Sequence, residues 1–386
     1  MKDKAQKFFH LYKSCFYKRD PHIWIFGAWF GNKYSDNSKY LFEEANKYEN
    51  VRAIWVTNND KVLQHVKNQG YEAYLMRSEE GISLQKRAKY FFSSTGFQDF
   101  AWEYTGNAVN YELWHGIPLK KIGWDDTLTP KQKILPLYYI VDYMRRIPRR
   151  KEYIIAPSED IKRIYMSCFR KRSDRVLVYG QPRNDLFYND DSSIKTKFGE
   201  NRKVILYMPT HRRSGKTKIN CNIIFNIEEL NDFCRKNNCI FVIKKHYYHR
   251  DENTELIGCQ YVIDITKEAY DPQELLYAAD ILITDYSSCY YDYLLLDRPV
   301  LFYNYDYDDY LLNDREMYYK YDEVTPGIIS HTFEELLSAL SIIVCDGIDE
   351  FHDERTRVRD LFYDKKAQRN VSRQIIDDIL YKEGLC

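Results

Sequence analysis

A polar turn follows one buried strand in the C-terminal half of the chain and has the chemistry to bind phosphate. The apolar run 281–283 leads into the turn Thr284–Ser288, which contains Asp285, Ser287 and Ser288. A helix is expected to begin there, so hydroxyl groups and free backbone N–H groups gather at a helix N-terminus, which attracts anions and phosphate above all. For the serine pair alone, an ordinary strand–helix unit capped by serine is the alternative interpretation.

Two further strands of this half are expected to end in polar residues of the same kind. Strand Lys203–Met208 is followed by Thr210 and Arg212, and strand Ile240–Ile243 is followed by His246. Because the carboxyl ends of parallel strands meet at one edge of a sheet, these side chains and the serine pair are expected to share one phosphate site. A single site explains the polar residues at three strand ends better than three unrelated occurrences would.

His115 is the candidate for acid–base chemistry. It ends a strand-like segment and is followed at once by Gly116, which places the imidazole where a strand becomes a loop. A histidine at such an edge can take a proton from an attacking hydroxyl near neutral pH. Lys120 and Lys121 follow closely and are candidates to hold phosphate or phospholipid head groups. A structural histidine is the alternative, and it is weakened by the motifs that accompany His115.

Two basic segments are candidates for contact with an anionic acceptor or lipid. In residues 1–20, apolar side chains fall roughly on one helical face with lysines around them, which suits the surface of an anionic membrane. Packing of that apolar face on the protein itself is an equal alternative. The second segment contains Arg145, Arg146, Arg149 and Arg150. Basic runs of this kind are usually solvated faces, which is the alternative there.

Alternating strands and helices must position these residues. Apolar runs at 23–26, 52–56 and 90–93 are separated by helical patterns, which predicts βαβ units and a mostly parallel sheet. With 386 residues the chain is long for one α/β core, and a polar linker at 189–201 marks the start of a second domain. We therefore expect an amphipathic N-terminal segment at 1–20, a first domain at 21–188, a second domain at 200–350 and a helical C-terminal segment at 351–386.

Composition and charge narrow the classes of function. Lys plus Arg and Asp plus Glu number 57 each, so no overall positive field favours nucleic acid as a partner. The nine cysteines include no C-x-x-C pair, which indicates reduced thiols rather than a disulfide framework or a zinc site. No apolar run is long enough for a signal peptide or a membrane span, so we expect a cytoplasmic protein.

A series of motifs resembles the CDP-glycerol glycerophosphotransferases, which prime and polymerise teichoic acids and have relatives in bacterial capsule synthesis. The motifs appear in the order of that family, and the likeness covers about residues 23–376. They are Trp114–Lys120 (WHGIPLK), Gly180–Asp185 (GQPRND), Leu206–Arg212 (LYMPTHR), Lys244–His246 (KKH) and Thr284–Ser288 (TDYSS), with the last continuing through Asp292–Tyr303 (DYLLLDRPVLFY).

The resemblance implies an α/β protein of the GT-B architecture, in which two Rossmann-like domains face each other across a cleft. The N-terminal domain would bind the acceptor and the C-terminal domain the nucleotide donor. By this likeness His115 corresponds to the proposed catalytic base, and His246 to a second histidine assigned to the donor phosphates or the leaving group. The candidate donor ligands are Arg183, Thr210, Arg212, Asp285, Ser287 and Ser288.

One departure from the family pattern concerns His246. The family usually has His-Pro, whereas this chain has Tyr247 after the histidine. Proline restricts the backbone of its own residue and of the one before it, so its replacement changes the rigidity of this loop. The loop that follows His246 therefore departs from the family pattern.

The reaction implied by the resemblance starts with a hydroxyl of a lipid-linked or oligosaccharide acceptor. That hydroxyl attacks the phosphorus distal to cytidine in CDP-glycerol, and CMP leaves. Such acceptors place the enzyme at the inner face of the cytoplasmic membrane, as a peripheral protein. The sequence contains no Walker A loop, and the pair Asp306 and Asp308 does not demand a metal. No metal ligands are predicted, and Mg²⁺ on the pyrophosphate is an open alternative.

Three other functions are compatible with the same pattern. The donor could be CDP-ribitol, or the protein could be a GT-B glycosyltransferase that uses a nucleotide sugar. A catalytically silent membrane scaffold is the alternative outside enzymes. The presence of both histidines, together with the phosphate-binding residue types, argues against the scaffold.

Overall fold

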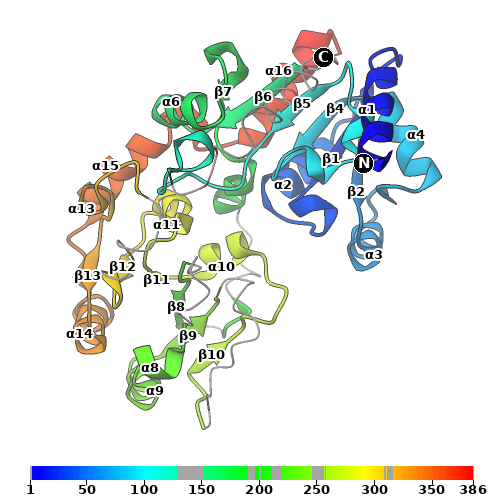
Figure 1. Cartoon of the computed structure of the whole chain (residues 1–386). Coiled ribbons are helices and arrows are strands. Elements are labelled where there is room, and N and C mark those ends of the chain that lie inside the picture. The colour runs from blue at the N-terminus through cyan, green and yellow to red at the C-terminus, as the bar shows by residue number, and fades with distance from the viewer. Residues whose placement is uncertain are drawn as a thin grey trace. The chain divides into compact units, whose positions relative to one another are not determined.

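The computed structural model describes residues 2–127, 151–189, 196–199, 201–210, 219–245, 256, 258–307, 310 and 316–385. The chain forms two compact units, each assembled from separate stretches of sequence (Figure 1). The first unit consists of Met1–His115, Thr129–Asp185 and Tyr363–Cys386. The second unit consists of Gly116–Leu128 and Leu186–Phe362.

The first unit is built on a parallel sheet of seven strands in the order β3-β2-β1-β4-β5-β6-β7. The order changes direction between β1 and β4, and Gly27 at the end of β1 is level with Ser93 at the end of β4. Ligands of open α/β sheets bind at such a switch point, beyond the carboxyl ends of the strands. The strands are β1 (Asp20–Gly27), β2 (Arg52–Thr57), β3 (Ala73–Leu75), β4 (Ala88–Ser93), β5 (Val109–Glu112), β6 (Lys151–Ala156) and β7 (Val176–Val178).

Helices cover both faces of this sheet because its strands are apolar on both sides. Trp24 and Phe26 of β1 point into one core, and Ile23 and Ile25 point into the other, as the twofold alternation of a strand requires. The helices of the unit are α1 (Lys2–Ser14), α2 (Asp36–Ala45), α3 (Asp60–Asn68), α4 (Glu79–Arg87), α6 (Glu159–Cys168) and α16 (Val371–Glu383), with short 3₁₀ turns η1 (Trp29–Gly31), η2 (Phe97–Asp99), η3 (Trp102–Tyr104), η5 (Ser173–Arg175) and η9 (Lys365–Ala367).

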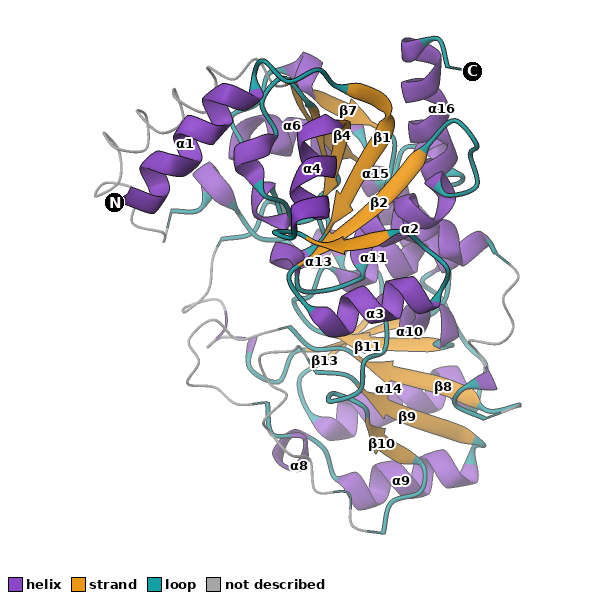
Figure 2. Cartoon of the chain, turned by 90° about the vertical axis from the view of Figure 1, so that its right-hand side faces the viewer, coloured by secondary structure: helices purple, strands orange, loops and turns teal. Residues whose placement is uncertain are grey.

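The second unit repeats this architecture with six parallel strands in the order β10-β9-β8-β11-β12-β13. Its switch point lies between β8 and β11, and α9 packs along β9 while α14 packs along β13 (Figure 2). The strands are β8 (Lys203–Tyr207), β9 (Cys239–Ile243), β10 (Val262–Asp264), β11 (Ile281–Thr284), β12 (Val300–Tyr303) and β13 (Ile328–Ser330). The helices and turns are η4 (Gly123–Asp125), α8 (Cys221–Ile224), α9 (Ile227–Lys236), α10 (Pro272–Ala278), α11 (Cys289–Tyr293), η8 (Leu294–Leu296), α13 (Tyr321–Val324), α14 (Phe333–Val344) and α15 (His352–Phe362), and η6 (Pro182–Tyr188) joins the two units.

The units are less continuous than the ranges 21–188 and 200–350 expected from the sequence. Helix α16 belongs to the first unit, because Val371, Ile375 and Ile379 are buried in the same core as Trp24. The stretch Gly116–Leu128 belongs instead to the second unit. The α/β class with parallel sheets in two units is confirmed.

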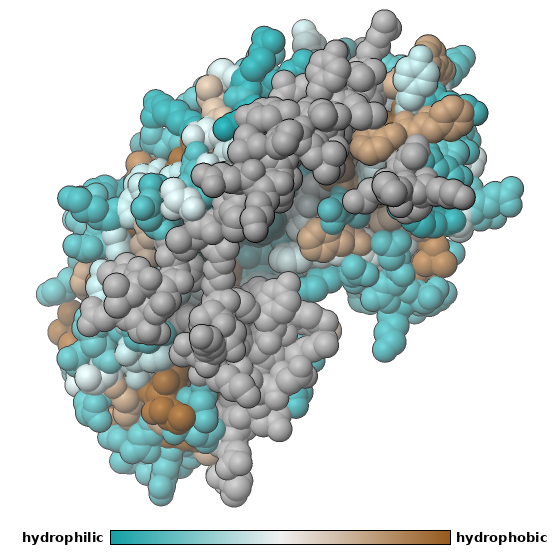
Figure 3. Space-filling view, in the orientation of Figure 1, coloured by the Kyte–Doolittle hydropathy of each residue, from teal (hydrophilic) through white to brown (hydrophobic). Residues whose placement is uncertain are grey.

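Helix α1 packs one side on the first unit and exposes the other. Leu11 is buried, and Phe8 meets Trp102 of η3 edge to face with ring centroids 5.5 Å apart. Phe9, Tyr12 and Phe16 are exposed. The apolar residues of the N-terminal segment are therefore divided between a packed side and an exposed aromatic side. The described surface of the face drawn in Figure 3 is mainly hydrophilic.

The side chain of Arg19 fixes the chain just after this helix. Its guanidinium donates hydrogen bonds to the carbonyl oxygens of Tyr104 at 2.7 Å and Ala88 at 3.0 Å. Burial is the main cause that lowers the pKa of Arg19 to about 10. This basic residue thus serves the fold, and the remaining cations of the segment are lysines.

Candidate active site

The imidazole of His115 lies just beyond β5, at the carboxyl edge of the first sheet. Its Nδ1 atom is 2.9 Å from the backbone carbonyl oxygen of Ser94, which follows β4. A carbonyl oxygen can only accept a hydrogen bond, so the neutral ring carries its proton on Nδ1 and keeps the lone pair on Nε2. In this tautomer Nε2 is the atom that can accept a proton, and the ring is only half-buried.

Aromatic rings flank His115. The ring of Trp114 is 4.2 Å from the imidazole centroid, and that of Trp29 is 5.6 Å away. Trp29, Phe30 and Trp114 all adopt left-handed backbone angles, with φ of 50°, 59° and 57°. Bulky residues rarely adopt this conformation, and strained backbone of this kind gathers at functional sites. The left-handed conformation could not be predicted from the sequence, because these positions carry no glycine.

Asp99 joins the loops that follow β1 and β4. Its carboxylate accepts backbone hydrogen bonds from Phe30 at 2.7 Å, Thr95 at 2.8 Å and Ser94 at 3.0 Å. Burial raises the pKa of Asp99, and these hydrogen bonds oppose the shift. Asp99 thereby holds the carbonyl group of Ser94 in place beneath His115. The sequence pattern did not indicate Asp99, because its contact with Phe30 joins residues that are 69 positions apart in the chain.

Glu112 is a second carboxyl group close to His115. It is the last residue of β5, accepting a hydrogen bond from Ser93 Oγ at 2.7 Å and another from the backbone N–H of Trp114 at 3.0 Å. Burial, and then the charge of Asp99, raise the pKa of Glu112 to about 8. The group is therefore largely protonated near neutral pH. It too was missed by the sequence analysis.

Arg183, a candidate donor-phosphate ligand in the sequence analysis, lies in the first unit together with His115. Its Nη1 atom is 2.8 Å from Asp36 Oδ1 and 2.8 Å from the carbonyl oxygen of His115. The side chains of Arg183 and Asp36 are 10% and 8% exposed, so the ion pair is largely removed from water.

Lys120 and Lys121 lie in the second unit, where both form contacts with residues of that unit. Lys120 donates a hydrogen bond to the hydroxyl of Tyr310, and Lys121 Nζ is 2.5 Å from a carboxylate oxygen of Glu316. The backbone N–H of Lys121 also donates to the carbonyl of Glu316 at 2.7 Å. These contacts attach the segment that follows His115 to the second unit. An additional role in binding acceptor or lipid stays a prediction for both lysines.

The structure brings the candidate residues after β8 and β11 together at the switch point of the second sheet. The buried carboxylate of Asp285 accepts a hydrogen bond from the backbone N–H of Thr210 at 2.8 Å, and Thr284 Oγ1 donates to the carbonyl of Met208 at 2.7 Å. Ser287 and Ser288 follow directly, half-buried, at the start of α11. Hydroxyl groups and backbone N–H groups thus gather at one edge, where an anion can be held.

Several predicted site residues lie outside the described residues. They are Arg145, Arg146, Arg149, Arg150, Arg212 and His246, and Asp308 of the acidic pair also falls there. Within the described ranges, no three His, Cys, Asp or Glu side chains gather where they could share a metal ion.

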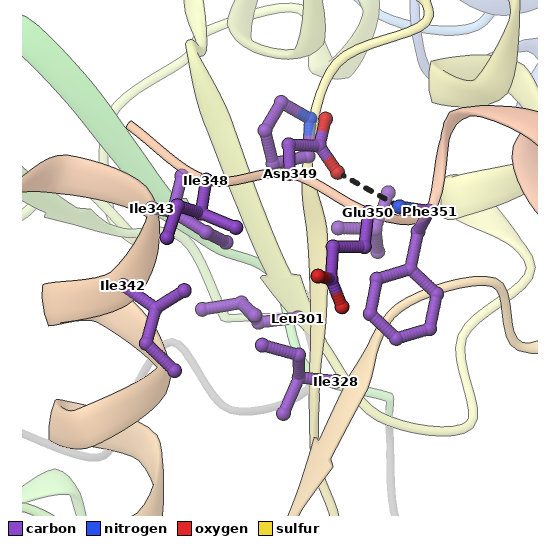
Figure 4. A pocket seen from close by; sticks show the side chains of 10 residues that line it. Leu301, Ile328, Ile342, Ile343, Ile348, Asp349, Glu350 and Phe351 are labelled. Atoms are coloured by element: carbon purple, nitrogen blue, oxygen red, sulfur yellow. Dashed lines mark hydrogen bonds between the residues drawn. The ribbon is translucent and has the colours of Figure 1, made fainter. Parts of the chain in front are cut away.

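A cavity of about 240 Å³ in the second unit lies away from the candidate site residues and is lined in a way that does not suit phosphate. It lies beside Val300 and Ile328, the first residues of β12 and β13, and therefore at the amino ends of the strands. Figure 4 shows Ile342, Ile343 and Ile348 around it. The cavity is apolar, and its charged residues are the acidic Asp349 and Glu350, which repel a phosphate group.

Comparisons with known proteins agree with the resemblance seen in the sequence. The family model described as CDP-glycerol:poly(glycerophosphate) glycerophosphotransferase matches residues 9–381. The teichoic acid glycerol-phosphate transferase of Staphylococcus aureus is 31% identical over 364 residues, which cover 90% of this chain and 89% of that protein. The teichoic acid poly(glycerol phosphate) polymerase of Staphylococcus epidermidis is 29% identical, and the match covers 94% of this chain but only 51% of the polymerase.

A solved structure shows the same relationship. The wall teichoic acid polymerase TagF superposes with a TM-score of 0.75 at 25% identity, covering 99% of this chain and 95% of that one. Among the helices described here, none combines the length and the apolar character needed to cross a lipid bilayer. The match of the family model over nearly the whole chain shows that this protein belongs to the CDP-glycerol:poly(glycerophosphate) glycerophosphotransferase family.

Proposed function

We propose that this protein transfers glycerol phosphate from CDP-glycerol to a hydroxyl group of a teichoic acid precursor and releases CMP. Membership of the family supports the reaction class, and the name of the S. aureus relative supports the acceptor class. The observation that carries the proposal is the hydrogen bond from His115 Nδ1 to the carbonyl of Ser94, because it leaves Nε2 able to accept a proton.

In this mechanism Nε2 of His115 removes the proton of the acceptor hydroxyl as the oxygen attacks the distal phosphorus. General-base catalysis of this kind contributes about 10²–10⁴-fold to the rate. The half-buried setting between Trp29 and Trp114 partly excludes water, which strengthens the electrostatic interactions of the developing charge.

The donor phosphates are assigned to the switch point of the second unit. Ser287 and Ser288 would donate hydroxyl and backbone hydrogen bonds, and Asp285 would hold the loop of Thr210 in place. Arg212 follows Thr210 in the same motif and would supply positive charge, which counteracts the negative charge on the transferring oxygens. His246 is assigned, from its motif alone, to the leaving phosphate of CMP.

We further propose that the two units face each other across a cleft in the GT-B manner, with the acceptor on the first and the nucleotide on the second. The protein would meet a lipid-linked acceptor as a peripheral protein at the inner face of the cytoplasmic membrane. The exposed aromatic side of α1 supports this location, since aromatic side chains with neighbouring lysines suit the membrane interface. Arg145, Arg146, Arg149 and Arg150 are further candidates for lipid contact.

The experiment that tests the proposal is a donor panel. The protein is incubated with a lipid-linked teichoic acid precursor and CDP-glycerol, CDP-ribitol or a UDP-sugar, and the release of CMP or UDP is followed. CMP release from CDP-glycerol that requires the acceptor is expected, with loss of turnover in His115→Gln. Preference for CDP-ribitol would show that the transferred polyol phosphate is ribitol phosphate. Release of UDP from the UDP-sugar would show that the protein is a glycosyltransferase. Binding without turnover of any donor would favour the scaffold.

A further inference from the structure

Two buried side chains hold the backbone that carries His115. Asn37 Nδ2 is 2.8 Å from the carbonyl oxygen of Trp114 and 3.3 Å from that of Leu113. Arg183 Nη1 is 2.8 Å from the carbonyl oxygen of His115 itself. Three consecutive carbonyl groups thus accept hydrogen bonds from one pair of residues, which restricts a segment that contains the left-handed Trp114.

The two donors are also bound to each other. The backbone N–H of Arg183 donates to Asn37 Oδ1 at 3.1 Å, and Asp36 Oδ1 accepts from the backbone N–H of Asn37 at 2.9 Å as well as from Arg183. Asn37 is fully buried and Arg183 is 8% exposed. A buried hydrogen-bond network of this kind restricts the geometry of the backbone that it holds.

The first residues of α2 also contact Ser94, the residue whose carbonyl is the hydrogen-bond partner of the His115 imidazole. The backbone N–H of Ser38 donates to Ser94 Oγ at 3.2 Å, and the two hydroxyl groups are 2.8 Å apart. The carbonyl of Ser94 is the group that accepts from His115 Nδ1. The first residues of α2 therefore fix both the backbone of His115 and the carbonyl that orients its ring.

We propose that Asp36, Asn37 and Arg183 are positioning residues for His115, and that Arg183 acts in this way and not as a ligand of the donor phosphates. The inference rests on the proposed function, in which His115 is the base. Arg183 Nη1 already serves two acceptors, and one of them is the carboxylate of Asp36, which offsets the positive charge that would attract a phosphate. Displacement of a catalytic group by about 1 Å can lower a rate on the order of 100-fold.

The proposal is tested with Arg183→Gln and Asn37→Ser, with Arg172→Gln as the control, because Arg172 is an exposed arginine of the same unit. Turnover and the affinity for CDP-glycerol are measured separately, the latter by calorimetry. We expect both test variants to lose about 10- to 100-fold in kcat while the donor Kd changes less than about twofold. The control should match the wild type in both quantities. A merely structural role would lower stability without this separation of kcat from Kd.

A second measurement does not depend on activity. Nitrogen-15 spectra of histidine-labelled protein report the tautomer of each imidazole, and the signal of His115 is assigned by its absence in His115→Gln. We expect the wild type to show the proton on Nδ1, and Arg183→Gln to show a mixture of tautomers. If Arg183→Gln does not fold, the same spectra are recorded on Asn37→Ser. If neither variant folds, they are recorded on Asp36→Asn.

The outcomes separate this inference from the proposed function. Weaker binding of CDP-glycerol by Arg183→Gln at unchanged kcat would overturn the positioning role and return Arg183 to the donor phosphates. An unchanged tautomer together with unchanged kcat would also overturn it. If His115→Gln turned over normally, the assignment of His115 as the base would fail, whereas the tautomer spectra would still decide whether Arg183 positions the ring. If the wild type released no CMP from CDP-glycerol, the proposed function itself would fail.

Discussion

The ring of Tyr310 stacks on that of Tyr286, with centroids 3.7 Å apart and an angle of 13° between the planes. Tyr286 lies inside the turn Thr284–Ser288, the proposed donor-phosphate site, and Lys120 donates a hydrogen bond to the hydroxyl of Tyr310. The ring of Tyr310 therefore packs against the turn through Tyr286. Tyr310 also contacts Lys120, which belongs to the segment that follows His115.

We predict that Tyr310→Ala weakens binding of CDP-glycerol, because the turn loses its stacking partner. Tyr310→Phe keeps the ring and loses the hydrogen bond to Lys120, so its donor affinity should be near that of the wild type. Aromatic pairs contribute about 0.5–1.5 kcal/mol beyond burial, which corresponds to a two- to tenfold change in Kd. Calorimetric titration measures it, and equal affinities of the Ala and Phe variants would contradict the role of stacking.

His115→Gln is expected to reduce kcat by about 10²–10⁴-fold while CDP-glycerol still binds, because a general base acts on the acceptor proton and not on the donor. His65→Gln serves as the matched control, since His65 is an exposed histidine on α3 of the same unit. Stopped assays of CMP release and a separate binding titration check both parts. Turnover of His115→Gln at the rate of the control would remove His115 from the mechanism.

The double variant Ser287→Ala and Ser288→Ala is expected to weaken CDP-glycerol binding, and so is Arg212→Ala. Each hydrogen bond to phosphate contributes roughly 1–3 kcal/mol, with the charge-assisted bond of an arginine at the upper end. Ser338→Ala on α14 is the control, because Ser338 is exposed and lies on another part of the second unit. Unchanged affinity in both test variants would place the phosphates elsewhere.

Glu112→Gln is expected to raise stability at alkaline pH more than at acidic pH. Burial first, and then Asp99, raise the pKa of Glu112 from 4.5 to about 8 in the folded protein, so folding favours its protonated form. The contribution of that form to stability is fully present below pH 4.5 and is lost as the pH rises to about 8. Since glutamine does not ionise, the advantage of the variant should grow by roughly 1–4 kcal/mol between about pH 5 and pH 9.

Denaturant unfolding of both proteins at the two pH values measures this difference. Ser338→Ala is again the control, because neither serine nor alanine ionises between the two pH values. An offset between Glu112→Gln and the wild type that is the same at both pH values would contradict the raised pKa of Glu112.

Replacement of Phe9, Tyr12 and Phe16 by serine is expected to reduce binding to anionic vesicles. The three side chains are exposed, so their loss should leave the packing of Leu11 and the thermal stability nearly unchanged. The lysines around them contribute about 1 kcal/mol each near an anionic surface, and salt screens this attraction. Co-sedimentation with vesicles of increasing anionic content measures binding. A wild-type protein that stays in the supernatant at low salt would end the peripheral-membrane proposal.

The strands were the most predictable part of the fold. Apolar runs gave β2, β4 and β11 to within two residues, because strands buried on both faces need continuous apolar sequence and end where polar residues begin. Those polar ends also located His115 and the turn Thr284–Ser288 at the carboxyl edges of their sheets. Local pattern was sufficient for these features, since they depend on neighbours in sequence.

The support of His115 could not be predicted in the same way. Arg183 reaches Asp36 and the carbonyl of His115 across long stretches of chain, so its sequence motif does not reveal these contacts. Glu112 likewise acquires its raised pKa from burial and from Asp99, neither of which is visible in local sequence. The packing of α16 against the first sheet is a further contact between residues far apart in sequence, and no local pattern predicts it.

The assignment of Gly116–Leu128 to the second unit affects the design of chimeras between relatives of this family. A chimera with a single junction in the linker near residue 189 would take Gly116–Leu128 from one parent protein and the rest of the second unit from the other. Its pairing of Lys120 with Met317, and the hydrogen bond from Tyr318 N–H to the carbonyl of Leu119, would then join residues of two different ancestors. A functional swap of the nucleotide half must therefore transplant two pieces of chain, and the first of its junctions falls at the peptide bond that follows His115.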